Sequence, residues 1–224
     1  MRFKVNFKGS DKVFDKSCLP QVKGWFEDTL MGRKNSQHDE PSNYCLSPML
    51  GGIRKDNTES FPDGGYIYIT SDSQELMGFI SLTLLTMASG SAVGNLVYES
   101  FEVVDDFHVH SDYDIVRAIS PILLRKERKN ITFKDDDFLP TLHENCVRKL
   151  IAHGISEKNA NSLSFELFHP EKAQVADMQY NGIHNFSSKV MVVVKGDKNA
   201  RRKLYNLGLG SSTGCGFGTV SLNK

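Results

Sequence analysis

The order of strand-like and helix-like segments is the feature that most constrains how this chain folds. Over the first hundred residues, the spacing of apolar side chains predicts four strands and two helices. In chain order these are a strand at 2–8, a helix at 16–31, strands at 44–50 and 66–70, a helix at 74–89 and a strand at 95–104. This succession is that of a ferredoxin-like unit.

The same order begins again after an acidic run at Asp105, Asp106, Asp112 and Asp114. The expected elements of this second pass are a strand at 114–124, a helix at 138–153, strands at 162–169, 174–181 and 189–195, a helix at 197–206 and a strand at 215–222. We therefore predict an α+β fold of two tandem ferredoxin-like (RRM-like) halves, residues 1–106 and 112–224. Only the order of elements repeats, because the residues of the two halves resemble each other weakly.

The charges are balanced overall and unevenly distributed. The 224 residues carry 27 Lys+Arg and 27 Asp+Glu. The balance is +4 over residues 1–55, −10 over residues 56–120 and +6 over residues 121–224. A neutral chain does not hold nucleic acid by bulk charge, but two basic regions around an acidic middle are compatible with a localised binding surface.

The cysteines and the N-terminus bear on the compartment. Cys18, Cys45, Cys146 and Cys215 lie far apart and show no zinc spacing, so we expect reduced thiols and no structural metal. The N-terminus alternates like a strand and lacks the apolar core of a signal peptide. The longest apolar stretch, 76–88, is too short to span a membrane. We expect a cytoplasmic protein.

Residues 208–218 read GLGSSTGCGFG, which is the strongest local signal in the chain. A P-loop requires GK[ST] followed by a helix, and a dinucleotide fingerprint requires a helix and a later acidic residue. Only six residues follow the loop, so neither pattern fits. Either the glycines serve tight turns, or they let the backbone approach a ligand and offer N–H groups to phosphate or bases. Arg201, Arg202 and Lys203 immediately upstream favour RNA.

With this loop the chain resembles the CRISPR-associated endoribonucleases that cut precursor CRISPR RNA within its repeats. The spacing of Gly208-Leu-Gly210 and Gly216-Phe-Gly218 is similar to that family's C-terminal signature loop. The segments YCLSPML at 44–50 and ISPILLR at 119–125 resemble its second strand and the strand that opens its second half. The resemblance spans the whole chain and implies the two ferredoxin-like halves.

The resemblance implies metal-independent RNA cleavage by the 2′-hydroxyl beside the scissile phosphate, leaving a 2′,3′-cyclic phosphate and a 5′-hydroxyl. Histidine suits the proton transfers because its pKa lies near working pH. The implied catalytic candidates are His38, in the polar loop after the first helix, and Tyr44. The remaining candidates are RNA-binding residues: Lys34, Arg54, Lys55, Arg125, Arg128, Lys129, Arg201, Arg202, Lys203, Gly208, Gly210, Ser211, Ser212, Gly216 and Gly218.

Two other functions stay open at this point. A non-catalytic RNA-binding subunit of a CRISPR effector complex could share the fold, with His38 incidental. If the chain were a small-ligand or regulatory module without an RNA role, its basic clusters would be chance groupings of solvent-exposed charges. His108 and His110 form an HxH pair without a third ligand at a defined spacing, so we expect no metal and no cofactor. Expected partners are repeat RNA and, less specifically, effector subunits or a second copy of the chain, with no membrane.

Overall fold

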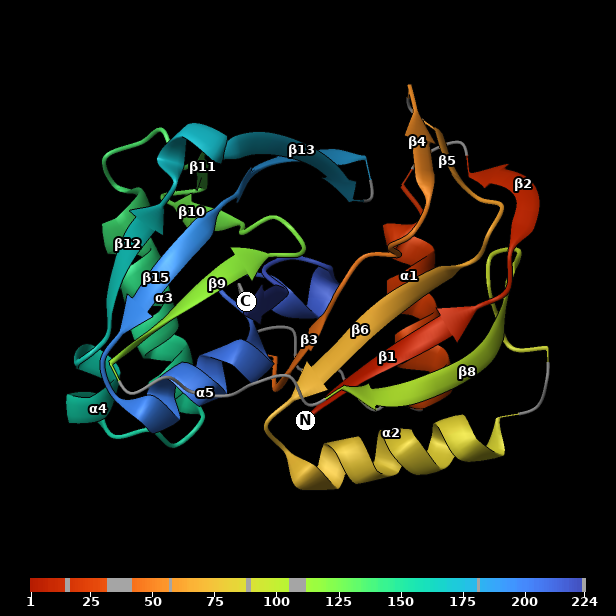
Figure 1. Cartoon of the computed structure of the whole chain (residues 1–224), viewed down its shortest axis with the longest axis horizontal. Helices are drawn as coiled ribbons and strands as arrows, with labels where there is room; N and C mark the ends of the chain where they lie inside the picture. Colours follow the sequence, from red (N-terminus) through yellow and green to blue (C-terminus); the bar gives the residue numbers. More distant parts are fainter. Residues whose placement is uncertain are drawn as a thin grey trace.

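A computed structural model describes residues 1–14, 17–31, 42–56, 58–87, 90–104, 112–180 and 182–222. Two sheets lie side by side, one from each half of the chain, as Figure 1 shows. Both have the ferredoxin-like strand order, so the predicted fold class is confirmed. The predicted boundary between the halves, near residues 106–112, falls mostly outside the described residues.

The N-terminal half is built on a five-stranded sheet of order β3-β6-β1-β8-β7. Its elements are β1 (Arg2–Phe7), α1 (Leu19–Trp25), the π-helical turn η1 (Phe26–Leu30), β3 (Tyr44–Leu46), β6 (Gly65–Ser71), α2 (Gln74–Thr86), β7 (Ala92–Val93) and β8 (Leu96–Val104). Pro20 stands in the first turn of α1, where a missing N–H costs nothing, and Ser73 caps α2 by accepting from the Leu76 N–H at 3.2 Å.

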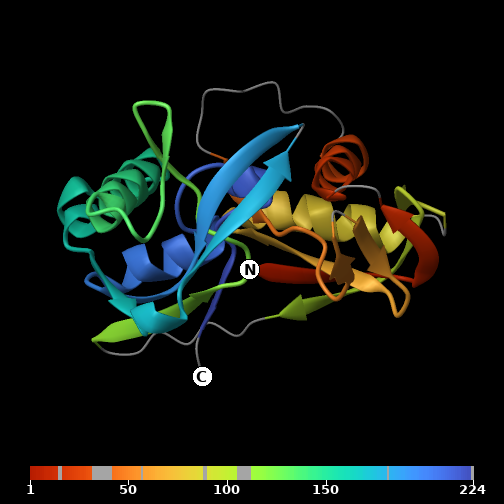
Figure 2. The same cartoon turned by 90° about the horizontal axis from the view of Figure 1, so that it is seen from above.

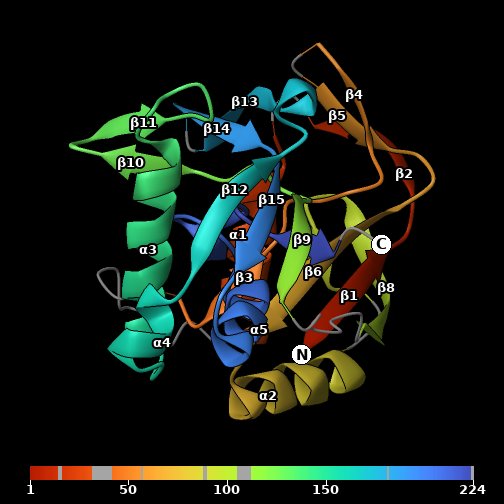
Figure 3. The same ribbon diagram turned by 60° about the vertical axis from the view of Figure 1, so that its left-hand side comes forward.

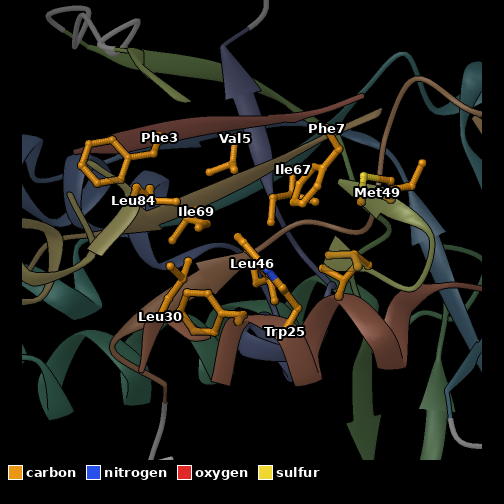
Figure 4. Packing of buried hydrophobic residues seen from close by; sticks show 14 of the residues in the cluster. Phe3, Val5, Phe7, Trp25, Leu30, Leu46, Met49, Ile67, Ile69 and Leu84 are labelled. Atoms are coloured by element: carbon orange, nitrogen blue, oxygen red, sulfur yellow. The ribbon is translucent and has the colours of Figure 1, made fainter. Parts of the chain in front are cut away.

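Both helices pack on the same face of this sheet. Phe3, Val5 and Ile67 point from the strands toward Trp25 and Leu30 of the helical layer (Figure 4). The other face of the sheet carries polar and aromatic side chains. The alternation expected of a half-buried strand is therefore realised in β1, whose burial alternates along its length.

A second, three-stranded sheet of order β2-β5-β4 was not predicted. It comprises β2 (Ser10–Phe14), β4 (Ile53–Lys55) and β5 (Thr58–Phe61). Residues 57–65 read as turns because Pro62, Gly64 and Gly65 follow so closely. Phe14 of β2 and Phe61 of β5, whose ring centroids lie 5.9 Å apart, are both buried and join the small sheet to the hydrophobic core of this half.

The C-terminal half has a four-stranded sheet of order β12-β15-β9-β16. Its elements are β9 (Tyr113–Ala118), α3 (Phe138–Ala152), α4 (Glu157–Asn161), β12 (Ser164–Phe168), the 3-10 turn η2 (Pro170–Lys172), β15 (Met191–Lys195), α5 (Lys198–Leu207), the 3-10 turn η3 (Thr213–Cys215) and β16 (Val220–Leu222). Counted in order within each half, the core strands of both sheets follow the order 2-3-1-4.

Two hairpins stand outside this sheet and change two predicted strands. They are β10 (Leu124–Lys126) with β11 (Lys129–Ile131), and β13 (Gln174–Tyr180) with β14 (Ile183–Lys189). The strand predicted at 114–124 ends at Ala118, before Pro121, which cannot donate to a ladder. The strand predicted at 174–181 pairs with β14 instead of entering the sheet.

Direct hydrogen bonds join the two halves. The Arg2 guanidinium donates to the Val220 carbonyl at 2.6 Å, and the Thr70 hydroxyl donates to the Asn206 carbonyl at 2.6 Å. The four cysteines are free thiols. Among the described residues, no helix is long and apolar enough to cross a membrane.

A buried ion pair lies inside the C-terminal half. Arg201 is 3% exposed and Asp114 is 1% exposed, and the guanidinium contacts the carboxylate at 2.5 Å. The same side chain also donates to the Gly196 carbonyl at 3.1 Å. Arg201 therefore joins α5 to β9. Its charge is paired inside the protein with that of Asp114.

We expect Arg201→Met to lower the free energy of unfolding by about 3 kcal/mol, because it leaves the Asp114 carboxylate buried without its counter-ion. Urea unfolding followed by circular dichroism measures the change. The matched control is Arg202→Met, which alters an exposed side chain on the same helix and should change stability by less than about 0.5 kcal/mol. Equal effects of the two substitutions would contradict the assignment of Arg201 to the core.

Candidate functional site

The glycine-rich loop between α5 and β16 lies inside the protein, against both halves. Lys149 of α3, only 6% exposed, donates to the carbonyl oxygens of Gly208 at 2.9 Å and Gly210 at 2.8 Å. A third, longer bond at 3.4 Å reaches the Leu207 carbonyl. These carbonyls lie at and beyond the C-terminus of α5, where backbone acceptors lack helical partners and a cation is favoured. Burial lowers the pKa of Lys149, so the carbonyls offset only part of its desolvation.

The four glycines of the signature all have positive φ, between +68° and +88°, which favours glycine. They are also packed too closely for a side chain. A Cβ at Gly216 would overlap the Leu19 side chain of α1, and one at Gly218 would overlap the Leu209 carbonyl. These glycines are buried, so the structure supports close packing of the loop against protein, whereas the sequence also allowed their approach to a ligand.

Ser211, Ser212 and Cys215 are the partly exposed residues of this loop. The Ser211 hydroxyl accepts a hydrogen bond from the Asn145 amide at 3.0 Å. Ser212 has a φ of +57°, an uncommon conformation for a residue with a side chain. Three side chains of the loop can therefore meet a ligand, while its glycines shape the backbone that presents them.

The loop meets β3 and Ser42, which lies two residues before it. A Cβ at Gly214 would lie 2.7 Å from the Ser42 hydroxyl and 3.1 Å from the Tyr44 ring. Tyr44 is 3% exposed, and its ring centroid is 4.7 Å from that of Phe26. The Cys45 thiol lies 3.2 Å from the Thr219 hydroxyl. Tyr44 is thus mainly a packing residue at the junction of the halves, and contact with a ligand would require its ring to become accessible.

His38 and Lys34 belong to residues 32–41, which lie outside the described residues, as do His108 and His110. Ser42 follows this segment directly and contacts the glycine-rich loop. Among the residues that the structure describes, no three His, Cys, Asp or Glu side chains gather in a way that could hold a metal ion.

A histidine outside that segment lies close to Ser42. His153, at the C-terminus of α3, has a pKa lowered by burial and by the neighbouring Lys203 and Lys149, so its imidazole is neutral at pH 7. Its backbone carbonyl accepts a hydrogen bond from the Lys203 ammonium at 2.5 Å. Nothing in the linear spacing indicated that His153, at the end of the helix predicted over 138–153, would lie close to Ser42.

The predicted basic residues separate into two groups. Arg54 and Lys55 on β4 and the cluster Arg125, Arg128 and Lys129 on β10–β11 are exposed. In Figures 1 and 3 the hairpins β4–β5, β10–β11 and β13–β14 project from the same end of the molecule. The Arg125 guanidinium also contacts the Asn185 amide oxygen of β14 at 2.5 Å, which links two of these hairpins.

The residues on α5 lie elsewhere. The helix runs along the opposite end of the molecule from the three hairpins (Figure 1). Arg201 is buried against Asp114, which overturns its placement on an RNA-binding surface. Lys203 forms an ion pair with Asp72 at 3.1 Å, and Arg202 is exposed. The sequence suggested one basic cluster at 201–203, but helical rotation points its three side chains in different directions.

A groove that the sequence did not suggest lies between the halves, with a volume of about 520 Å³. Its basic and aromatic lining comes from separate elements: Arg117, Lys172, Lys189, His169 and Tyr66. The period of two in β9 could have placed Arg117 on the open face of the sheet, because its neighbours in the strand are buried. The other members come together only through the topology.

We expect Gly216→Ala to lower the free energy of unfolding by more than about 2 kcal/mol, because the new methyl group adds a steric clash with Leu19 to the strain of a positive φ. Gly154→Ala is the control. Its φ of +82° is similar, but nothing lies within 4 Å of the added atom, so only the conformational cost of about 1 kcal/mol remains. Unfolding in guanidinium chloride measures the free energy of unfolding of both variants. Equal losses of stability would show that packing against Leu19 is not the reason for glycine at position 216.

Comparison with known proteins identifies the family of this chain. The family model for the C-terminal domain of the CRISPR-associated protein Cas6 matches residues 105–222. No curated protein sequence matches the chain.

Solved structures match along the whole chain. A Cas6-related protein from Pyrococcus furiosus has a TM-score of 0.82 at 15% identity, over 100% of this chain and 98% of that chain. A RAMP protein binding different RNA substrates has a TM-score of 0.80 at 16% identity, over 100% of both chains. A CRISPR-associated protein Cas6 has 0.76 at 19%, over 100% and 99%. At these identities the likeness shows the fold, whereas the family model covers more than half of the chain. The chain belongs to the Cas6 family of CRISPR-associated proteins.

Proposed function

We propose that this protein is a metal-independent endoribonuclease that cleaves precursor CRISPR RNA within its repeats. The observation that carries the proposal is the contact of Gly214, in the family's signature loop, with Ser42, four positions after His38. The loop therefore reaches the end of the segment that holds the candidate proton-transfer residue. Family membership supports repeat RNA as the substrate, and one structural neighbour is a Cas6 product complex with a TM-score of 0.70 at 12% identity.

The proposed reaction is a transesterification in which the RNA supplies the nucleophile. The 2′-oxygen forms a bond to phosphorus as the bond from phosphorus to the 5′-oxygen breaks. The 2′-hydroxyl loses its proton, the leaving 5′-oxygen gains one, and no oxidation occurs. The protein has to move protons, neutralise charge at phosphorus and hold the backbone in line, and side chains are sufficient for all three.

The exposed basic hairpins are the proposed surface for the repeat RNA. A-form RNA is recognised largely through its shape and backbone, for which Arg128 and Lys129 on β10–β11 offer cations. Arg54 and Lys55 on β4 lie at the same end of the molecule, and the groove lined by Arg117 and Tyr66 leads between the halves. We include these elements in the proposed RNA-binding surface.

Incubation of the protein with a repeat RNA from its own genome, in the presence of EDTA, tests the reaction on a denaturing gel. We expect one cut per repeat, with a 2′,3′-cyclic phosphate on the upstream product. A single 2′-deoxy substitution at the scissile position should abolish the cut. Cleavage of that deoxy substrate would contradict attack by the 2′-hydroxyl, and binding without cleavage would favour a non-catalytic RNA-binding subunit.

His38→Ala should lower the single-turnover cleavage rate by about a hundredfold or more, because one proton-transfer group is lost, while affinity for the 2′-deoxy RNA is retained. His143→Ala, on α3, is the matched histidine control and should leave the rate unchanged. A fully active His38→Ala enzyme would place the proton-transfer residue elsewhere.

Arg128→Gln with Lys129→Gln should weaken binding to repeat RNA and reduce the slope of log affinity against log salt by about 1 to 2, since each lost phosphate contact removes roughly one released counterion. Lys158→Gln with Lys198→Gln is the control, because these exposed lysines lie at the end of the molecule away from the hairpins. Filter binding at several salt concentrations measures both slopes. An equal loss of slope in both double variants would contradict a localised surface.

A further inference from the structure

The β13–β14 hairpin turns one of its faces toward the rest of the protein. Figure 2 shows the hairpin reaching across from the C-terminal half toward α1. On this face, Asn185 is 3% exposed and Tyr180 interacts with Lys23 of α1. The Lys23 ammonium in turn lies 3.2 Å from the Cys215 sulfur of the glycine-rich loop. The hairpin therefore contacts both halves, which fixes the direction of its other face.

That other face, which we call the outer face, carries Val175, Asp177, Gln179, His184 and Phe186. The register places Asp177 opposite Phe186 and Gln179 opposite His184, and residues opposite each other in an antiparallel pair share a face. Phe186 is 50% exposed and Val175 is 39% exposed. Gln179 is the diagonal neighbour of Phe186, a separation that long side chains can bridge. The outer face thus holds a solvent-exposed aromatic ring among polar side chains.

The three polar side chains of the outer face form a hydrogen-bonded row. The Asp177 carboxylate lies 2.7 Å from the His184 Nδ1, and the Gln179 amide nitrogen lies 3.0 Å from the His184 Nε2. When Nδ1 carries the hydrogen and donates to Asp177, Nε2 is an acceptor for the Gln179 N–H. This contact uses one N–H of the amide and turns its second N–H and its carbonyl oxygen away from the imidazole. A donor and an acceptor that are already oriented lose little freedom when they bind a partner.

The charges around the outer face suit a nucleic acid. Asp177 is the only acidic residue of the two strands, and its carboxylate is directed at His184. Lys189 ends β14 and is exposed, and the Arg125 guanidinium contacts the same strand through Asn185 at 2.5 Å. These cations are partners for the phosphates attached to a base on the outer face.

We propose that the outer face binds one unpaired adenine of the RNA. The inference rests on the proposed RNA substrate and adds a base that the protein reads. The adenine ring stacks on Phe186, as bases stack on aromatic side chains in single-stranded sites. The Gln179 carbonyl oxygen accepts from the adenine N6 amino group, and its N–H donates to N7. Uracil lacks N7, and guanine has an acceptor in place of the N6 donor, so this pairing selects adenine.

Fluorescence anisotropy with two labelled RNA octamers tests the proposal. One octamer contains only uridine, and the other has a single adenosine in the middle. We expect the wild-type protein to bind the adenosine octamer about fivefold more tightly or better, because one bidentate pair discriminates to this extent. Gln179→Met should remove the preference. Phe186→Leu should weaken binding of the adenosine octamer by about tenfold, because one stacked base is lost.

Ile183→Ala is the matched control. Ile183 is 64% exposed on the same strand as Phe186, but it pairs with Tyr180 and belongs to the opposite face. This variant should keep both the wild-type affinities and the preference. Losses equal to those of Phe186→Leu would overturn the assignment to the outer face, and so would a wild-type protein that binds the two octamers equally.

An octamer with 7-deazaadenosine tests the pairing without any protein variant. This base keeps the ring and the N6 amino group but lacks the N7 acceptor. The wild-type protein should bind it no more tightly than the uridine octamer binds. A preference as large as that for adenosine would overturn the pairing with Gln179.

The binding assay requires no cleavage, so the inference and the proposed function fail separately. If the wild-type protein cuts its repeat RNA but binds both octamers equally, the nuclease stands and the outer face is not a site for adenine. If the protein prefers adenosine, loses the preference in Gln179→Met and leaves its repeat RNA intact, the outer face binds adenine and the proposed nuclease function fails.

Discussion

Lys149 is buried in the C-terminal half with its ammonium group directed at the backbone carbonyls of Gly208 and Gly210. Taking a lysine out of water costs several kcal/mol, and here backbone acceptors at the end of α5 take the place of a counter-ion. The arrangement fixes the point at which the chain leaves the helix and enters the glycine-rich loop. The later part of that loop can then pack between α1 and β3, which is where the two halves meet.

Two kinds of constraint act on the glycine-rich loop together. Positive φ angles let the chain reverse direction repeatedly, and the absence of side chains lets it pack against Leu19 and the Leu209 carbonyl. A loop built in this way is stiff, because eight of its eleven residues are buried. Rigid placement suits a site that has to hold an RNA backbone in line, since loss of alignment is costly in reactions of this type.

The basic residues of this chain, whose net charge is zero, fall into a buried group and an exposed group. Arg201 and Lys149 are used inside the protein, the former against Asp114 and the latter against carbonyls. The cations on the hairpins remain exposed at one end of the molecule. The buried charges contribute to folding alone. Counting the charges of a segment therefore overstates the number of cations that RNA can contact.

Much of the fold followed from the sequence alone. Apolar periodicity predicted the βαββαβ order of both halves, because one face of each strand and helix has to be buried whatever its neighbours are. The pattern predicted the strand β13, but it did not identify its partner β14 or the hairpins β4–β5 and β10–β11, which stand outside the two main sheets. The sequence also indicated the glycine-rich loop and His38 through resemblance to a family.

Only the tertiary structure decided how the remaining site residues are used. Arg201 and Arg202 are adjacent in the chain, yet one is buried and the other is exposed, because the direction in which each points depends on what α5 packs against. Lys23 lies more than 150 positions from both Tyr180 and Cys215, and the three residues belong to no common motif. They meet because the two sheets lie side by side and a hairpin from one reaches a helix of the other. Sequence spacing records local periodicity, whereas such long-range juxtapositions depend on how whole elements pack.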